Sequence, residues 1–436
     1  MKQFFFQTLC LIISINSVAQ QPVIQWQDVS GGTEHDDLRS VIVTSDGNYV
    51  TVGSTQSNNG DVSNNHGGID VFLMKYNQNG SLLWTKTYGG SSYEFGIAVR
   101  ETSDGGFIIF GTSYSTDGDA NVTYGSGDFW IVKTDAVGNL QWQKSYGTNG
   151  YDRAKDIRQT SDGGYIIIGA AHGSGGNSTN HYGNSDIWIL KLNSAGDLTW
   201  QRIYGGASDE KPGNILQTPD GGYIFLGDTS SCGGDVIGIH DPDGCTDGYI
   251  NRDLWLVKLT ASGDIVWQSA LGTNGNDELK YYGDSLQATS DGGYVVCGSS
   301  NPSYTGSGGS RNFIIYKLSA IGATQWSHNY GGLDDDYAYS IVQTSDGGYV
   351  VSGDTESNFS GVDGNHSQSY GSYWGKDIWT IKLDALGILQ WQKCYGGFHA
   401  EYASSMQLTV DGGLIIAGST SSTNTGDVVG GSGPEH

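Results

Sequence analysis

One unit of about 58 residues recurs along the chain, and this periodicity is the strongest constraint on how it folds. Its two clearest markers are an Asp-Gly-(Gly/Asn) turn and a tryptophan placed before each turn, and both occur seven times. The turns begin at Asp46, Asp104, Asp162, Asp220, Asp291, Asp346 and Asp411. The tryptophans are Trp26, Trp84, Trp142, Trp200, Trp267, Trp326 and Trp391. A chain with such regular copies must build one supersecondary unit repeatedly and bury its faces against neighbouring copies.

Each copy is predicted to form four short antiparallel strands, called a, b, c and d in chain order. In the third copy, β-forming residues precede the Asp162 turn, follow it from Tyr165 to Gly169, and recur at 186–191 and 198–204. Glycines in the intervening turns supply the positive φ that hairpins require. Four strands in a repeat of this length are typical of a β-propeller blade.

We therefore predict an all-β, seven-bladed propeller in which the N-terminal strand around Trp26 completes the last blade. The strand-c motif occurs only six times, starting at Asp70, Asp128, Asp186, Asp253, Asn312 and Asp377. No seventh copy follows Gly418. Either the closing blade has three strands, or its missing strand lies in chain beyond His436, in which case seven is a minimum.

Composition agrees with this class and excludes several functions. The 436 residues include 69 Gly, which is unfavourable inside helices, and aromatic side chains are too frequent for a disordered chain. The formal net charge is −25, from 46 Asp+Glu against 21 Lys+Arg, and no basic run occurs. Such a surface repels nucleic acid and anionic lipid, so neither is expected as a partner.

The first 19 residues have the pattern of a secretory signal peptide. Lys2 precedes an apolar stretch from Phe4 to Ile15, and Ser17-Val18-Ala19 fits a small-x-small cleavage site. We expect a mature single propeller domain, 20–436, that is secreted, periplasmic or on the cell surface, without membrane insertion, and monomeric. Cys10 lies in the apolar stretch, which leaves a lipoprotein as the alternative.

Cysteine placement fits an oxidising compartment. Cys232 and Cys245 share one long loop and are predicted to form a disulfide. Cys297 and Cys394 lie in apolar strand patterns and are expected to be buried hydrophobic residues rather than nucleophiles.

The combined motif resembles the secreted bacterial β-propeller repeats known as SBBP repeats. It consists of Asp-x-Trp-x-x-Lys-Leu, a Gly turn, Trp, Tyr-Gly-Gly, an acidic loop and Thr-x-Asp-Gly-Gly-Tyr, and it covers nearly the whole mature chain. It is most similar to versions in surface and secreted proteins of Bacteroidetes. The resemblance implies a propeller and implies no particular activity.

A carboxylate stands ten residues after every strand-d tryptophan. The set is Asp36, Glu94, Asp152, Glu210, Asp277, Asp336 and Glu401. Because it recurs in every blade, we interpret it as a structural ring that accepts backbone N–H groups of the d-to-a crossover. The alternative is a carboxylate ring that holds a cation at the channel mouth. Pairs such as Asp70/Lys75 and Asp128/Lys133 are expected to brace strand c.

Function is expected where the blades differ, which is in the long b–c loops on the b–c/d–a face. Asp241, Asp243 and Asp247 in the fourth blade have the spacing of hard oxygen ligands for Ca²⁺, against the alternative of a solvated acidic turn. Asp117, Asp119 and Asn121 form a weaker version of this pattern.

The sixth blade carries an aromatic cluster that fits a sugar ring. It contains Tyr370, Tyr373 and Trp374, although packing over the neighbouring blade is the alternative. The sequence thus predicts a secreted or cell-surface binding and adhesion scaffold, with Ca²⁺ as its one candidate cofactor and a glycan or surface protein as partner. The alternatives are a carbohydrate-active enzyme, either a glycosidase or a polysaccharide lyase on the same face, and a structural module of a larger surface protein.

Overall fold

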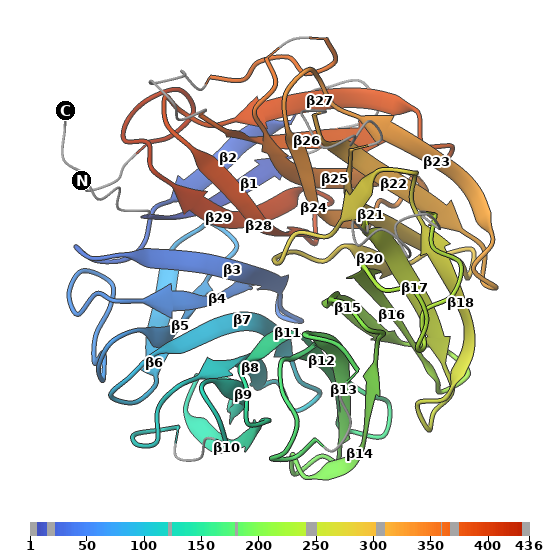
Figure 1. The fold of residues 1–436 in the computed structure, drawn as a ribbon. Coiled ribbons are helices and arrows are strands. Elements are labelled where there is room, and N and C mark those ends of the chain that lie inside the picture. The colour runs from blue at the N-terminus through green and yellow to red at the C-terminus, as the bar shows by residue number, and fades with distance from the viewer. Residues whose placement is uncertain are drawn as a thin grey trace.

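The chain folds into β-sheets that radiate around a central axis (Figure 1). The computed structural model describes residues 7–14, 22–120, 124–178, 182–240, 251–301, 310–358, 360–366 and 375–429. All the regular elements in these ranges are strands. None of these ranges contains a helix long and apolar enough to span a bilayer. The prediction of an all-β propeller with four-stranded antiparallel blades is confirmed.

Six blades consist of consecutive strands, with strand a innermost and strand d outermost (Figure 1). Blade one contains β3 (Asp36–Val43), β4 (Tyr49–Thr55), β5 (Asp70–Tyr76) and β6 (Leu82–Tyr88). Blade two contains β7 (Glu94–Glu101), β8 (Phe107–Ser113), β9 (Asp128–Thr134) and β10 (Leu140–Tyr146). Blade three contains β11 (Asp152–Gln159), β12 (Tyr165–Ala171), β13 (Asp186–Leu192) and β14 (Leu198–Tyr204). Blade four contains β15 (Glu210–Gln217), β16 (Tyr223–Thr229), β17 (Asp253–Leu259) and β18 (Ile265–Leu271).

Blade five differs from the others because its innermost strand is divided into two short pieces. It contains β19 (Asn276–Glu278), β20 (Leu286–Ala288), β21 (Tyr294–Asn301), β22 (Asn312–Leu318) and β23 (Thr324–Tyr330). Both β19 and β20 pair with β21, and the segment between them leaves the sheet. Blade six contains β24 (Asp336–Gln343), β25 (Tyr349–Thr355), β26 (Asp377–Leu383) and β27 (Leu389–Tyr395).

The expectation of seven blades is corrected. The structure has six blades of consecutive strands, and a composite sheet made from both ends of the chain fills the remaining place in the ring. This closing sheet contains β1 (Gln7–Ser14), β2 (Val23–Asp28), β28 (Glu401–Leu408) and β29 (Leu414–Thr420), in the order β2-β1-β29-β28. The N-terminal strand β2 closes the sheet as predicted.

The expected gap at strand c of the closing sheet is filled by β1, a segment assigned above to the signal peptide. β1 pairs with β29 on one side and with β2 on the other. An apolar, β-branched segment suits a position with a neighbouring strand at both edges. The signal peptide itself stays a prediction.

The strand-c lysines pair across the blade rather than along their own strand, which corrects the expected Asp70/Lys75 type of pair. Lys75 Nζ lies 3.0 Å from Asp46 Oδ2, and Lys133 Nζ lies 2.9 Å from Asp104 Oδ2. Residues five apart in a strand point to opposite faces, so Asp70 and Lys75 cannot meet. The same bond joins Lys191 to Asp162, Lys258 to Asp220, Lys317 to Asp291 and Lys382 to Asp346.

Neighbouring blades are joined by aromatic packing and by a repeated hydrogen bond. The rings of Phe129 in blade two and Trp188 in blade three have their centroids 4.9 Å apart in a shared apolar core. The Tyr146 hydroxyl, which ends strand d of blade two, donates to the Gly196 carbonyl in the c–d turn of blade three at 2.6 Å. The same bond is donated by Tyr88, Tyr204 and Tyr330, so it joins four pairs of neighbouring blades.

Candidate functional site

The seven recurring carboxylates are buried in the d-to-a crossovers. Each accepts a hydrogen bond from the backbone N–H four residues earlier, as when Gly90 N donates to Glu94 Oε2 at 2.8 Å. The equivalent donors to the other six are Gly32, Thr148, Gly206, Thr273, Gly332 and Gly397. Hydroxyl groups add further bonds, for example from Thr229 to Glu210 Oε1 at 2.7 Å. The ring carboxylates therefore hold the crossovers in place.

In five blades, the first residue of strand c is a second buried carboxylate, which lies close to the ring carboxylate of the following sheet. Blade five has Asn312 at this position. Asp377 Oδ1 and Glu401 Oε2 flank Gly396, where an added Cβ would lie 2.5 and 2.6 Å from these two oxygens. The first glycine of the Tyr-Gly-Gly motif is therefore required for space. Burial raises the pKa of Asp377 to about 6 and that of Glu401 to about 7.

Lysine and arginine are distributed very unevenly in this acidic protein. Six lysines serve the strand-c bonds described above, and Lys86, Lys144, Arg202 and Lys393 lie on outermost strands. Apart from Lys2, the remaining cations lie on innermost strands, in the segment between β19 and β20, or just before strand c in blades four to six. They are Arg39, Arg100, Arg153, Lys155, Arg158, Lys211, Arg252, Lys280, Arg311 and Lys376.

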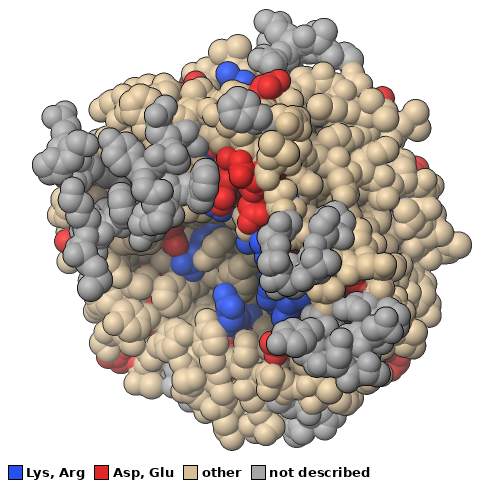
Figure 2. Space-filling view, turned by 45° about the horizontal axis from the view of Figure 1, so that its top comes forward, with Lys and Arg blue, Asp and Glu red and all other residues tan. Residues whose placement is uncertain are grey.

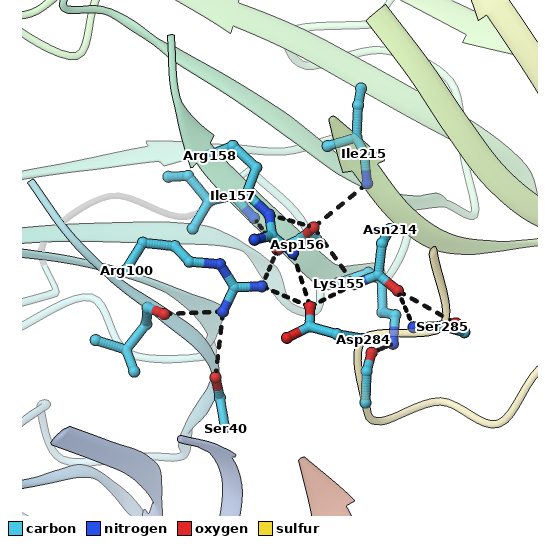
Figure 3. A network of polar contacts seen from close by, with 12 residues as sticks. Ser40, Arg100, Lys155, Asp156, Ile157, Arg158, Asn214, Ile215, Asp284 and Ser285 are labelled. Carbon is cyan, nitrogen blue, oxygen red and sulfur yellow. Dashed lines mark hydrogen bonds and ion pairs between the residues drawn. The ribbon is translucent and has the colours of Figure 1, made fainter. Parts of the chain in front are cut away.

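Part of this group forms a polar plug in the channel, built around the segment between β19 and β20 (Figure 3). Asp284 Oδ1 accepts hydrogen bonds from Arg100 Nη2 at 2.8 Å and from Arg158 Nη2 at 2.7 Å. Both arginines also bind Asp156, at 2.7 and 3.0 Å. Lys155 Nζ donates to the Tyr281 and Gly283 carbonyls at 2.6 and 3.0 Å. The inserted segment is thus fixed to blades two and three across the axis.

The buried charges of the plug are paired with charges of opposite sign. Burial alone would raise the pKa of Asp284, but the adjacent Arg100 and Arg158 lower it to about 2. Burial lowers the pKa of Lys155 to about 8. The cavity lined by these residues has a volume of only about 10 Å³, which is the size of one water molecule.

A second cluster lies at the mouth of the channel on the b–c/d–a face and is centred on the Tyr337 ring. Lys280 Nζ lies 3.5 Å from the ring centroid, Lys376 Nζ 4.6 Å and Arg311 Cζ 5.7 Å. The Tyr337 hydroxyl donates to Asp335 Oδ2 at 2.7 Å. We call Lys280, Arg311, Tyr337 and Lys376 the mouth cluster. Figure 2 shows basic and acidic side chains gathered around a hollow at the centre of one face.

The cations of the mouth cluster differ in their partners. Arg311 Nε binds Glu278 at 3.0 Å, and Lys376 Nζ binds Glu356 at 2.7 Å. Within the part of the chain that the structure describes, no carboxylate lies in ion-pair distance of Lys280. Burial lowers the pKa of Lys280, and the nearby Lys376 and Arg311 lower it further against the opposing effect of Glu278.

Arg153, at the start of the innermost strand of blade three, is also without a carboxylate. Its Cζ lies 4.0 Å from the centroid of the Tyr281 ring, and its buried Nε has no hydrogen-bond partner among the described residues. Two cations at the channel are therefore held against aromatic rings, with no carboxylate at ion-pair distance among the described residues.

A cavity of about 210 Å³ opens between the closing sheet and blades one and six. Its lining includes His35, Arg39, Tyr282, Tyr339 and Tyr402. The Tyr339 hydroxyl donates to Asp354 at 2.6 Å, and burial raises the pKa of Asp354 to about 7. Arg39 is bound by Asp37 at 2.6 Å and stacks on Tyr282, with 5.2 Å from its Cζ to the ring centroid.

The structure describes only some of the site residues predicted from the loops. Asp241, Asp243, Asp247 and Cys245 lie outside the described residues, as do Asn121, Tyr370, Tyr373 and Trp374. Asp117 Oδ1 accepts a hydrogen bond from Ser91 N at 2.8 Å, and Asp119 Oδ2 accepts one from Gly89 N at 3.3 Å. No group of three metal-ligating side chains occurs in the described ranges.

Cys232 lies in the loop after β16, and the predicted disulfide to Cys245 stays a prediction. Cys297 and Cys394 are buried free thiols, and burial raises the pKa of both well above the ordinary range. A thiol in this state is not an activated nucleophile, in agreement with their interpretation as core residues.

The polar plug and the mouth cluster were not predicted from the sequence. One signal was available, because the interval from the ring carboxylate to the a–b turn aspartate is ten residues at Asp336–Asp346 and fourteen at Asp277–Asp291. A second signal was the restriction of the remaining cations to strand a and to the residue before strand c. Both become meaningful only once strand a is known to line the channel.

Comparisons with known proteins agree with the fold. No family model matches the chain and no curated protein matches it, so the resemblance to SBBP repeats stays a prediction. A polysaccharide lyase described as an ulvan lyase has a TM-score of 0.51 and 9% identity, over 85% of this chain and 87% of that one. A Bacteroides caccae protein of unknown function has a TM-score of 0.41 and 14% identity, over 74% and 94%. The Neurospora crassa Pan2 WD40 domain has a TM-score of 0.47 and 10% identity, over 88% and 89%. At these identities, the likeness to the ulvan lyase shows a β-propeller fold and nothing further.

Proposed function

We propose that this propeller is an exported binding scaffold that holds an anionic ligand, such as an acidic glycan, at its channel mouth. The observation that carries this proposal is the pair of cations Lys280 and Arg153, which have no carboxylate partner in the described chain. In a protein with a net charge of −25, leaving two such cations unpaired with a carboxylate favours an external anion.

The aromatic surroundings support a carboxylate or sulfate group as the part of the ligand that is recognised. Tyr337 and Tyr281 hold Lys280 and Arg153 at fixed positions by cation–π contact, which reduces the side-chain entropy lost when a ligand binds. Hydrogen bonds between charged partners are worth about 1.5–3 kcal/mol each. A polymer with several anionic groups would engage both cations at once.

Binding of oligogalacturonate tests this proposal, with a neutral dextran oligosaccharide of similar length as the reference probe. Isothermal titration calorimetry should detect the acidic oligosaccharide only, with affinity falling as salt increases. Lys280→Gln and Arg153→Gln should each weaken binding about tenfold. Lys144→Gln, on the outermost strand β10, is the matched control and should leave binding unchanged. Equal binding of both probes, binding that no variant alters, or no binding would reject the proposal.

A second candidate, a polysaccharide lyase, is favoured by the cavity that contains His35, Arg39, Tyr339 and Tyr402. Elimination at a uronic acid needs a positive group beside the sugar carboxylate and side chains able to transfer protons. Release of an unsaturated sugar, followed by ultraviolet absorbance, would identify this activity, and Tyr402→Phe should reduce it. A glycosidase is less well supported, because the ring carboxylates are all hydrogen-bonded to crossover donors.

The proposal includes export of the protein and binding of Ca²⁺. The signal-peptide pattern supports a secreted, periplasmic or cell-surface location, and the Asp241, Asp243 and Asp247 spacing supports Ca²⁺ as a brace for the loop after β16. Expression of the full chain in a bacterial host with fractionation, followed by mass spectrometry of the mature N-terminus, tests export directly.

A further inference from the structure

The strand-c position of the closing sheet is occupied by a segment that lacks the residues other blades place there. By register, β1 aligns with strand c, because Leu9 pairs with Gly418 just as Trp188 pairs with Gly169 in blade three. In the same register, Gln7 stands at the position of the first aspartate and Ile12 at the position of the lysine. The Asp-x-Trp-x-x-Lys pattern is thus absent from β1.

Four blades have a tryptophan in strand c that donates to a glutamine on strand d, and the closing sheet has the matching glutamine. In blade three, Trp188 Nε1 donates to Gln201 Oε1 at 2.9 Å, and Gln201 follows the strand-d tryptophan Trp200. Gln27 follows Trp26 in the same way and accepts a hydrogen bond from Val429 N at 3.2 Å. In blade four, Gln268 Oε1 accepts from both a loop N–H and the Trp255 indole, so this side chain has capacity for both donors.

The partner that receives the strand-c lysine is present as well. Asp411 in the a–b turn of the closing sheet accepts hydrogen bonds from the Thr409 hydroxyl and from Gly413 N, like its counterparts in other blades. Those counterparts also bind a lysine, as Asp162 binds Lys191 at 2.9 Å. Among the described residues, no cation is paired with Asp411. The closing sheet therefore keeps two receptor groups for a strand it does not contain.

We propose that the slot between β29 and β2 accepts an extended segment from outside residues 1–436 that carries the pattern Asp-x-Trp-x-x-Lys-Leu. The slot becomes available when residues 7–14 are removed with the predicted leader. This proposal does not depend on the anion site proposed above. Departure of β1 exposes two strand edges at once, and edges of this kind bind added strands through backbone hydrogen bonds. A second copy of this chain is not the expected donor, because its own strands of this pattern are already paired within their blades.

Strand exchange in the full chain tests the proposal. The chain is folded with a protease site introduced between residues 15 and 21, cut after folding, and mixed with a labelled peptide that has the sequence of Asp186–Leu192. The peptide should displace residues 7–14 and raise the melting temperature. A control peptide with alanine in place of the tryptophan and lysine should bind about tenfold more weakly, given the hydrogen bond and ion pair that it lacks. Equal affinity for the two peptides, no exchange, or dimerisation of the cut protein in light scattering would overturn the proposal.

A variant of the uncut chain provides a second readout that does not depend on exchange. Leu9→Trp combined with Ile12→Lys should raise the melting temperature, because it supplies the donors for Gln27 and Asp411. In an Asp411→Asn background, the gain from Ile12→Lys should be lost. A melting temperature that stays constant or falls in the combined variant would show that the slot does not favour this pattern. Neither experiment uses an anionic ligand, so each can fail independently of the proposed function.

Discussion

Asn312 in blade five flanks Gly331 together with Asp336, at the place where the other five blades of consecutive strands have an aspartate. The site therefore accepts an uncharged amide in one copy and a carboxylate in the others. Two ionised carboxylates at such a site repel each other and lose hydration, so a fold with one neutral member is favoured.

This arrangement predicts that stability decreases as the pH rises from about 5 to 8. Burial raises the pKa of Asp152 and Asp377 to about 6 and that of Glu210 to about 7. A raised pKa means that the folded protein favours the protonated acid, so this stability is complete below pH 4 and lost through pH 6–7. Melting temperatures measured across this range by tryptophan fluorescence should fall.

Asp128→Asn serves as the test variant, because it copies the Asn312 arrangement beside Asp152. It should flatten the pH dependence and raise the melting temperature at pH 8 more than at pH 5. The a–b turn aspartates do not interfere in this window, since lysine and hydroxyl partners lower the pKa of Asp162 and Asp220 to about 2. A melting temperature that increases with pH would contradict the prediction.

Substitution of the first glycine in a Tyr-Gly-Gly motif should be among the most damaging single changes. In Gly396→Ala, the new methyl group would meet Asp377 and Glu401 at 2.5 and 2.6 Å, so a crossover or a strand must shift. We expect a loss of about 3 kcal/mol in the free energy of unfolding, measured in urea. Gly221→Ala is the control, since its φ of +81° is strained but nothing lies within 4 Å. The control should cost about 1 kcal/mol, and equal losses would refute the steric explanation.

The polar plug should depend strongly on Asp284. Asp284→Ala leaves Arg100 and Arg158 with only Asp156 between them, and breaking a buried ion pair from one side costs about 3–5 kcal/mol. Gln407→Ala removes a single bond of 3.2 Å to the same carboxylate and should cost about 1 kcal/mol. Denaturant unfolding of both variants measures the difference. A small loss of stability for Asp284→Ala would mean that the inserted segment is held mainly by the hydrogen bonds from the Lys155 side chain to the Tyr281 and Gly283 carbonyls.

Calcium should stabilise the protein through the loop that follows β16. We expect the melting temperature in excess Ca²⁺ to exceed that in EGTA, and Asp243→Asn to abolish the difference. Mg²⁺ is the control ion, because it prefers six ligands in a tight octahedron and should give a smaller shift. An identical response to both ions would indicate general screening of the acidic surface.

Sequence reasoning reached the architecture because the determinants of a blade are local. The Asp162 turn, the strand from Tyr165 and the final tryptophan each follow from turn chemistry and alternation, and repetition reduces the error in each assignment. The partner of Lys191 could not be obtained this way, because the lysine reaches past the neighbouring strand β12 to Asp162 in the a–b turn. The blade count also needed the structure, since β1 joins its sheet from the far end of the chain.

The channel residues were harder to predict for a physical reason. Arg100, Arg158 and Asp284 come from three blades and meet only because closure of the ring brings them to one axis. No local sequence pattern predicts that these three residues contact one another. Tyr337 of the mouth cluster and Tyr281 of the polar plug look in the sequence like ordinary strand aromatics, and only their position at the axis distinguishes them.

The four additional residues in blade five change how the central axis of the ring is filled. Without it, the axis of a propeller is a tube that joins two solvent compartments. With Tyr281 and Asp284 bonded to Lys155 and Arg100, the inserted segment lies across this axis. The segment therefore ties blade five directly to blades two and three, so these blades are held together through the axis as well as around the ring.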